Sequence, residues 1–199
     1  MFNLLNPILA NREHISEWTN EELFSKYLST QKVYYFDIIY KRLSARVFAK
    51  CMSFLKSEDE ANDALQDIFI TVLLKASKFE GRSKLSTWIY SITYNHCVDI
   101  VRKKKREKRV LVDDWGRFEN TIEIEDSLLL ETRVDQLKII LEKIPAKDKA
   151  ILLMKYQDDM SIKEISASLE KSESAIKMML NRAKQKFRNI HAEINKEYN

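Results

Sequence analysis

The sequence predicts an all-α protein made of two small helical domains joined by an acidic linker. Glycine and proline occur only twice each in 199 residues, and a chain so poor in turn residues cannot easily build sandwiches, barrels or glycine-rich phosphate loops. Net charge divides the chain into a block of +6 over residues 1–110, a connector of −5 over residues 111–130 and a block of +3 over residues 131–199. The connector contains Gly116, and we interpret it as an interdomain linker.

The first basic block reads as successive amphipathic helices. Thr19 and Glu22 form a capping-box pattern that opens a helix to about Leu28. A second helix is predicted over Val33–Leu55 and a third over Glu58–Ala76, because apolar residues recur at the 3.6-residue period. The core positions of these two helices are Phe36, Ile39, Tyr40, Leu43, Val47, Phe48, Met52, Leu55, Ala61, Ala64, Leu65, Ile68, Phe69 and Val72.

The outward face of the third helix is acidic. Asp59, Asp63 and Asp67 recur every four residues, with Gln66 beside them, although like charges at this spacing repel. An ordinary solvent-exposed helix face would also carry acidic residues in its first turn, where the positive end of the helix dipole stabilises them. It does not explain Asp67, two turns further along, so the stripe indicates a docking face for a basic partner.

A fourth helix is predicted over Leu85–Lys105, after a loop around Gly81. Its predicted core positions are Leu85, Trp88, Ile89, Ile92, His96 and Ile100, and its predicted outward residues are Thr87, Ser91, Tyr94, Asn95, Asp99 and Arg102. Seven cations follow within the eight residues 102–109, more than the helix dipole accounts for. Such a run is typical of polyanion binding. The loop, the polar face and the cationic end of the helix together predict a groove that binds DNA, including single-stranded DNA.

The second basic block has a helix-turn-helix pattern. A helix over Leu137–Ile144 precedes Pro145, which suits the first turn of the next helix. Ser161 and Glu164 form a capping box for a short helix over Ile162–Leu169, and a three-residue turn leads to a long helix from Glu173 to about Ile194. The cations of that last helix are Lys177, Arg182, Lys184, Lys186 and Arg188.

Other chemistries find no support in the sequence. Cys51 and Cys97 form no CxxC pattern, which fits buried thiols in a reducing cytoplasm rather than zinc or disulfide sites. No phosphate-loop, dinucleotide or HExxH motif occurs, no apolar run approaches the ~20 residues of a membrane span, and residues 1–11 lack the pattern of a signal peptide. We therefore predict no catalytic residues, no metal, no cofactor and no small-molecule substrate.

Taken together and in order, these segments resemble the extracytoplasmic-function sigma factors, the small two-domain initiation subunits of bacterial RNA polymerase. Residues 61–69 resemble the pattern A-x-D-x-x-Q-D/E-x-F, residues 79–92 resemble F-x-G-x-S-x-x-x-T-W-L/I-x-x-I, and Asn95, Asp99 and Arg102 match its continuation N-x-x-x-D-x-x-R. Residues 141–145, 153–156, 161–166 and 176–177 resemble the family's C-terminal domain.

The resemblance implies a region 2-like domain over residues 19–109, an acidic linker over residues 110–130 and a region 4-like helix-turn-helix domain over residues 131–199; residues 1–18 remain unassigned. It implies that the acidic face binds core polymerase through Asp59, Asp63, Gln66 and Asp67. The −10 element would be recognised and melted by Glu80, Gly81, Arg82, Ser83, Lys84, Asn95, Asp99, Arg102 and Lys103. The −35 element would contact Ser172, Ser174, Ala175, Lys177, Met178, Met179 and Arg182.

Two positions depart from the family pattern. The turn position usually held by glycine is here Glu170 or Lys171, so a residue with a side chain is expected to take positive φ. Lys177 is followed by Met178 and Met179 rather than by a small polar residue and an arginine. Methionine cannot bond guanine in a bidentate manner but can contact thymine methyl groups, so we predict that the domain binds the −35 element but do not predict which −35 sequence it prefers.

The predicted protein is thus a cytoplasmic sigma factor that is not itself an enzyme. Its implied partners are the core of bacterial RNA polymerase, promoter DNA and an anti-sigma factor, which in this family is often membrane-bound. A stand-alone regulator that uses only the helix-turn-helix would bind duplex operators without polymerase, and leaves the acidic face unexplained. A polyanion- or RNA-binding protein would need only the cationic run, and leaves the second domain without a role.

Overall fold

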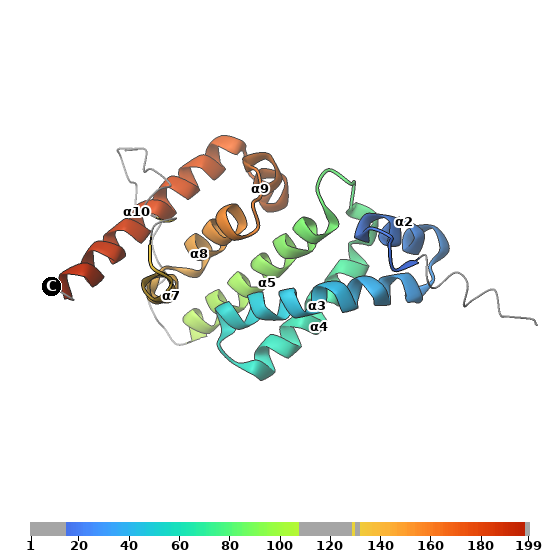
Figure 1. Cartoon of the computed structure of the whole chain (residues 1–199), viewed down its shortest axis with the longest axis horizontal. Coiled ribbons are helices and arrows are strands. Elements are labelled where there is room, and N and C mark those ends of the chain that lie inside the picture. Colours follow the sequence, from blue (N-terminus) through green and yellow to red (C-terminus); the bar gives the residue numbers. More distant parts are fainter. Residues whose placement is uncertain (1–14, 108–128, 130–131, 198–199) are drawn as a thin grey trace, which may run out of the picture.

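The computed structural model describes residues 15–107, 129 and 132–197 (Figure 1). These residues form helices and connecting turns without a strand, which confirms the predicted all-α class. The first group comprises α2 (Asn20–Thr30), α3 (Val33–Leu55), α4 (Glu58–Leu74), a short 3₁₀ turn η1 (Ala76–Lys78) and α5 (Leu85–Glu107). The second comprises α7 (Val134–Lys143), α8 (Ala146–Leu152), a π-helical turn η2 (Leu153–Gln157), α9 (Ile162–Leu169) and α10 (Glu173–Glu197). The predicted linker lies outside the described residues except for Leu129.

The ends of the first helices follow from local hydrogen bonding. At α2, the Thr19 hydroxyl accepts from the backbone N–H of Glu22, and the Glu22 carboxylate accepts from the backbone N–H of Thr19, so the predicted capping box is present. Helix α3 ends at Leu55, because the next residue, Lys56, takes a positive φ that terminates the helix. The Ser57 hydroxyl then caps α4, whose first turn carries three acidic residues at the positive end of the helix dipole.

The core of the first group lies where α2, α3, α4 and α5 pack against one another. Its buried side chains include Leu23, Phe24, Ile39, Leu43, Val47, Ala61, Ile68, Val72, Leu85 and Ile89. Cys51 and Cys97 are also buried here as free thiols, as the sequence predicts. The described part of the N-terminal extension is tied to this domain, because the Arg42 guanidinium donates to the carbonyl oxygens of Trp18 (2.6 Å) and Ser16 (2.8 Å). The Trp18 ring stacks on Tyr35 with 6.0 Å between centroids.

The second group packs α7, α8 and α9 against the long helix α10. Its buried side chains include Ile140, Ile151, Met154, Met160, Ile165, Ile176, Leu180, Ala183, Phe187 and Ile194. The capping box predicted for α9 is present, since Ser161 and Glu164 exchange side-chain and backbone hydrogen bonds of 2.9 and 3.2 Å. Pro145 lies at the N-cap of α8, one position before the first turn where the sequence placed it.

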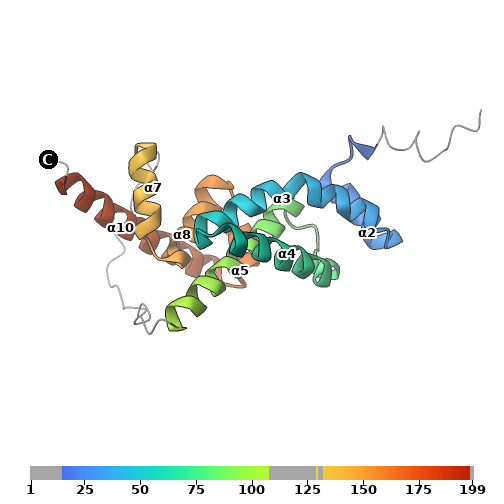
Figure 2. The same cartoon turned by 90° about the horizontal axis from the view of Figure 1, so that it is seen from below.

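Helix α5 lies in the middle of the molecule, between the other helices of the first domain and helices α8 and α9 of the second (Figures 1 and 2). This position corrects the predicted division of α5 into a buried and an outward face. Thr87, Ser91 and Tyr94, predicted to face outward, are buried, because a helix packed on two sides has little free surface. Ser91 satisfies its hydroxyl locally by donating to the Trp88 carbonyl at 2.7 Å.

Among the described helices, none combines the length and the apolar character needed to cross a bilayer.

Candidate functional site

The acidic stripe predicted on the third helix forms one exposed face of α4. Asp59, Asp63, Gln66 and Asp67 are all exposed, and their spacing of three to four residues places them on the same side of the helix. Their neighbours Ala64, Leu65 and Ile68 are buried against the core. The four polar side chains are therefore held on a rigid helix and presented together to solvent.

Three exposed apolar side chains extend the same face toward the C-terminal end of α4. Ile70, Leu73 and Leu74 are 54%, 37% and 79% exposed, and they continue the three-to-four-residue spacing that begins at Asp59. Sequence reasoning missed them because apolar residues near a helix end are ordinarily counted with the core. The available signal was their position in register with the acidic stripe rather than with Ile68 and Val72. We call the seven residues together the α4 face.

The loop that precedes α5 is held at both of its ends. At its base, Phe79 packs edge-on against Phe24 and close to Trp88, with ring centroids 5.5 and 5.3 Å apart. At its far end, the Glu21 carboxylate accepts from the backbone N–H of Leu85 at 2.6 Å and so caps α5. Gly81 lies between these anchors with φ of +69°, a conformation that glycine adopts without strain.

The side chains of this loop point largely to solvent. Glu80, Gly81, Arg82 and Lys84 are exposed and Ser83 is half-buried. The Arg82 guanidinium lies 2.6 Å from the Glu80 carboxylate, an exposed ion pair that contributes little to stability. The loop is thus an accessible polar surface on a fixed base.

The predicted −10 residues further along α5 are exposed as well. Asn95, Asp99, Arg102 and Lys103 form the polar side of the second half of the helix. The lysines at the cationic end of α5 differ in their surroundings. Lys104 pairs with Glu60 of α4, whereas Lys103 and Lys105 are exposed to solvent. Lys108 and Arg109, the last two cations of the run, lie outside the described residues.

The start of α10 presents the predicted −35 residues. The Ser172 hydroxyl accepts from the backbone N–H of Ala175 at 3.2 Å and lies 3.0 Å from the Ser174 hydroxyl, so these residues cap the helix. Ser172, Ser174, Lys177 and Met178 are exposed, and Ala175, Met179 and Arg182 are half-buried. Glu170, with φ of +52°, makes the turn between α9 and α10. This confirms that a residue with a side chain occupies the left-handed turn position.

These surfaces belong to different elements of the two domains. The α4 face belongs to the first domain alone. Helix α5, predicted to bind the −10 element, lies against α8 and α9, so the exposed Asp99 and Arg102 come close to Lys147 of α8. Burial and the nearby Arg102 and Lys171 charges lower the pKa of Lys147. The residues predicted to bind the −35 element lie beyond α9, at the start of α10.

Comparison with protein families matches both domains. Residues 39–107 match the model of sigma-70 region 2, and residues 135–187 match that of sigma-70 region 4, which together span more than half of the chain. The chain is 27% identical to the ECF RNA polymerase sigma factor SigW of Bacillus subtilis (strain 168) over 152 residues, covering 72% of this chain and 81% of SigW. It is 26% identical to SigX of the same organism, covering 81% of this chain and 86% of SigX.

Solved structures show the same fold. CnrH, solved with the cytosolic domain of CnrY, has a TM-score of 0.58 at 19% identity, with 86% of this chain and 96% of CnrH covered. RpoE of Bartonella quintana, solved with the anti-sigma factor NepR, has a TM-score of 0.54 at 19% identity, with 78% and 95% covered. Two helical domains of these types define a sigma factor of the sigma-70 class. More particularly, the chain belongs to the extracytoplasmic-function sigma factors, and it is a transcription initiation factor that directs RNA polymerase to promoters.

Proposed function

We propose that the chain performs this role through three separate surfaces: the α4 face binds core polymerase, the Glu80–Lys84 loop and α5 bind the −10 element, and the start of α10 binds the −35 element. The proposed domains are residues 19–109 and 131–199, with residues 110–130 as linker. The observation that carries the proposal is the α4 face, because exposed leucines in register with an acidic stripe are typical of a binding surface rather than of a helix face that contacts only water.

The composition of the α4 face favours a basic partner with an apolar centre. Asp63 and Asp67 supply charge for orientation and for a fast encounter. Ile70 and Leu74 supply apolar area, which at about 25 cal/mol per Å² is the stronger source of binding free energy. A helical, cationic surface of core polymerase with exposed apolar residues fits both halves of the face.

The −10 surface combines an accessible loop with a polar helix. Extracting a base from the duplex costs a few kcal/mol of free energy. Contacts between the extracted base and the loop around Gly81 would offset this cost once the strand is melted. Asn95 and Arg102 can bond base edges or phosphates. Lys103 and Lys105 would release counterions from the phosphate backbone. This surface needs no nucleotide hydrolysis, which agrees with a protein that is not an enzyme.

The −35 surface uses the exposed first turns of α10. Helix-turn-helix proteins place the N-terminal part of the second helix in the major groove, and Ser172, Ser174 and Lys177 lie there, together with Met178, which is 60% exposed. The serine hydroxyls and the Lys177 ammonium would contact phosphates or base edges. The Met178 side chain would contact thymine methyl groups.

We place the protein in the cytoplasm, where core polymerase and promoter DNA are found. We further propose that an anti-sigma factor holds it inactive, in the membrane or free of it. Both solved neighbours support this proposal, since RpoE is in complex with the anti-sigma factor NepR and CnrH with the cytosolic domain of CnrY.

The proposal is tested by removing charge from the α4 face. Asp63→Ala combined with Asp67→Ala should weaken binding to core polymerase by ~10-fold or more, because both carboxylates would lie in the interface. Affinity is measured by fluorescence anisotropy with labelled sigma, and activity by run-off transcription on genomic promoter fragments.

The matched control is Asp37→Ala with Glu193→Ala, which removes the same charge from exposed positions of α3 and α10. It should leave core affinity within ~2-fold of that of the unmodified chain. Equal losses in both double variants would show that net charge, not the α4 face, determines binding.

A further inference from the structure

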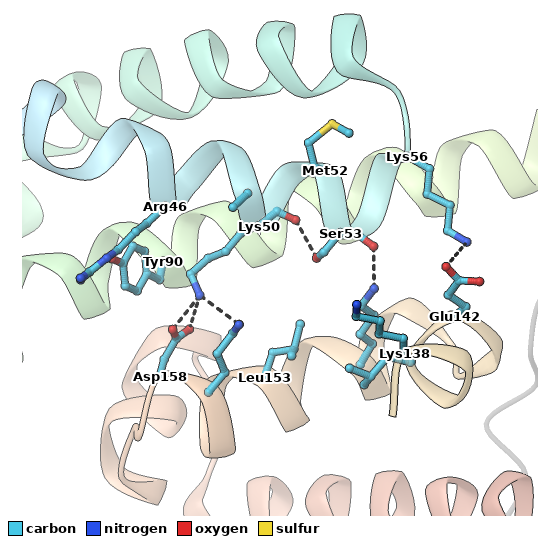
Figure 3. A pocket seen from close by; sticks show the side chains of 14 residues that line it. Arg46, Lys50, Met52, Ser53, Lys56, Tyr90, Lys138, Glu142, Leu153 and Asp158 are labelled. Carbon is cyan, nitrogen blue, oxygen red and sulfur yellow. Dashed lines mark hydrogen bonds and ion pairs between the residues drawn. The ribbon is translucent and has the colours of Figure 1, made fainter. Parts of the chain in front are cut away.

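The two domains border an open cleft of about 850 Å³, which is lined by none of the residues proposed to bind polymerase or DNA. Side chains of α3 project into this interdomain cleft from one side, and side chains of the second domain form the other side (Figure 3). Its charged lining residues are the cations Arg46, Lys50, Lys56, Lys138 and Lys149 and the carboxylates Glu142 and Asp158. A cleft with an excess of one charge attracts ions of the opposite sign, so the interdomain cleft favours anions.

Both carboxylates of the cleft already have a cationic partner within the protein. The Lys50 ammonium lies 2.6 and 2.9 Å from the two carboxylate oxygens of Asp158, and both side chains are only 8% exposed. Lys56 lies 3.5 Å from Glu142 across the cleft, and both of these side chains are more than half exposed. Among the described residues, the lining cations that no carboxylate pairs with are Arg46, Lys138 and Lys149.

Lys149 differs from an ordinary surface lysine because it is buried. It is 8% exposed, its ammonium donates to the Ser53 carbonyl at 2.5 Å, and it lies 4.9 Å from the centre of the Phe54 ring. Burial lowers the pKa of Lys149, and the neighbouring Lys56 lowers it further. A buried charge is costly unless it is paired, so an anion bound in the cleft would stabilise the ammonium form of Lys149.

A buried hydroxyl provides a second, independent sign of a ligand. Tyr90 lines the cleft and is only 7% exposed, and its hydroxyl is buried without a hydrogen-bond partner among the described residues. The Lys50 ammonium lies 4.5 Å from the centre of the Tyr90 ring and so fixes the ring beside a cation. Because buried polar groups nearly always have a hydrogen-bond partner, this hydroxyl is a donor available to an oxygen atom of a bound molecule.

The size and the lining of the cleft fit a small molecule. Its volume lies within the range of small-molecule sites, roughly 300–1,000 Å³. The unpaired cations include both an arginine, which can bind phosphate oxygens through two parallel hydrogen bonds, and lysines, which bind phosphate as point charges. The half-buried Met52, Leu141 and Leu153 add an apolar part to the lining, which can accommodate an organic group attached to the phosphates.

We propose that the interdomain cleft binds a small polyphosphate anion, either free or carried by a nucleotide. Lys149 would donate to phosphate oxygens in the interior, and the exposed Arg46 and Lys138 would bind the anion at the mouth of the cleft. The Tyr90 hydroxyl would donate to a further phosphate oxygen. The site lies on both domains, so the anion would contact both of them at once.

Binding is measured by isothermal titration calorimetry with the free full-length chain, so the test does not depend on polymerase. The probes are inorganic pyrophosphate, ADP and AMP, each without divalent cations and at concentrations up to ~1 mM. Pyrophosphate and ADP should bind, and AMP should bind at least ~10-fold more weakly than ADP because it carries one phosphate group fewer. Equal affinities of pyrophosphate and ADP would identify a free polyphosphate as the ligand, and tighter binding of ADP would identify a nucleotide.

Three variants separate a built site from general attraction to a basic protein. Lys149→Met should weaken ADP binding by ~10-fold or more, because a charged hydrogen bond to phosphate is lost. Tyr90→Phe leaves the charge and the ring unchanged and should weaken binding by ~5-fold through loss of the hydroxyl alone. Lys163→Met is the matched control: it removes the same charge from an exposed position of α9 outside the cleft, and should leave affinity within ~2-fold of the wild type.

Several results would overturn the proposal. The first is absence of both pyrophosphate and ADP binding to the wild type at ~1 mM. The second is an equal loss of affinity in Lys149→Met and Lys163→Met, which would show that net charge alone attracts the anion. The third is wild-type affinity in folded Tyr90→Phe and Lys149→Met, with folding checked by circular dichroism. Displacement of ADP by a single-stranded oligonucleotide, with the same dependence on Lys149, would assign the cleft to DNA instead.

Discussion

At the scale of single residues, Glu170 occupies a left-handed backbone conformation that is unfavourable for a residue with a side chain. It ends α9 with φ of +52° and ψ of +45°, and a residue with a Cβ atom pays about 1–2 kcal/mol for this left-handed conformation. Helices often end in glycine at this point. The sequence left the choice between Glu170 and Lys171 open, and the structure assigns the positive φ to Glu170.

Glu170→Gly should therefore stabilise the protein. The relief of left-handed strain exceeds the extra entropy that glycine loses on folding, so we expect a gain of about 0.5–1 kcal/mol in the free energy of unfolding. Urea denaturation followed by circular dichroism measures it. Lys171→Gly is the matched control: Lys171 has no positive φ, so glycine there should be neutral or destabilising. A less stable Glu170→Gly variant would contradict the strain argument.

Residue patterns predicted the exposed candidate sites better than the buried polar ones. The polar residues of the α4 face and of the loop around Gly81 were found because their spacing or local motif lies within one element. Lys50 was missed because a single lysine within an amphipathic helix ordinarily extends to solvent. Its partner Asp158 is 108 positions away, and no local spacing connects them.

At the scale of elements, helix positions follow from the sequence because their causes are local. The predicted bounds of α3 and α9 agree with the structure, and the capping boxes at Thr19 and Ser161 are present. The faces of α5 were predicted less well. Amphipathic reasoning assumes one buried side, whereas α5 is packed on two sides and buries Thr87 and Ser91.

The cationic end of α5 gives a prediction for this element. Lys103→Ala and Lys105→Ala should each reduce the slope of log affinity against log salt by about 0.7–0.9 for holoenzyme binding to −10 DNA, because each exposed lysine neutralises about one phosphate. Lys104→Ala should reduce it less, since Glu60 already neutralises part of that charge. Fluorescence anisotropy over a salt series measures the slopes. Three equal slopes would show that the pair with Glu60 is not maintained on DNA.

At the scale of the whole molecule, the division into two helical domains follows from charge and from the order of motifs, but their contact does not. The interface joins residues that lie 64 to 108 positions apart: Asp158 with Tyr94 and Lys50, and Lys149 with Ser53. Such contacts depend on complementary shape, which composition and periodicity do not encode. The acidic linker could be predicted from its charge, and its path lies outside the described residues.

The buried lysines make the contact between the two domains depend on pH; we call the chain with this contact the closed form and the chain without it the open form. Burial lowers the pKa of both Lys50 and Lys149 in the closed form, the first despite its contact with Asp158 and the second with a further contribution from Lys56. In the open form, both regain a pKa near 10.5. At low pH both forms are protonated, and closure bears the full cost of burying the charges. As pH rises through the lowered pKa values, the closed form releases protons that the open form retains, so closure becomes more favourable.

We therefore expect energy transfer between dyes on Ser25→Cys of α2 and Glu193→Cys of α10, two exposed positions, to rise from pH 7 to about pH 9.5. The raised pKa of Tyr94, caused by its burial and by Asp158, opposes the trend only where an exposed tyrosine ionises, near pH 10. Lys149→Met should increase closure at pH 7 and weaken its pH dependence. Lys138→Met is the matched control, since Lys138 lines the same cleft but is exposed, and it should retain the full dependence. A closed fraction that falls between pH 7 and 9.5 would show that the lysines are not buried by domain closure.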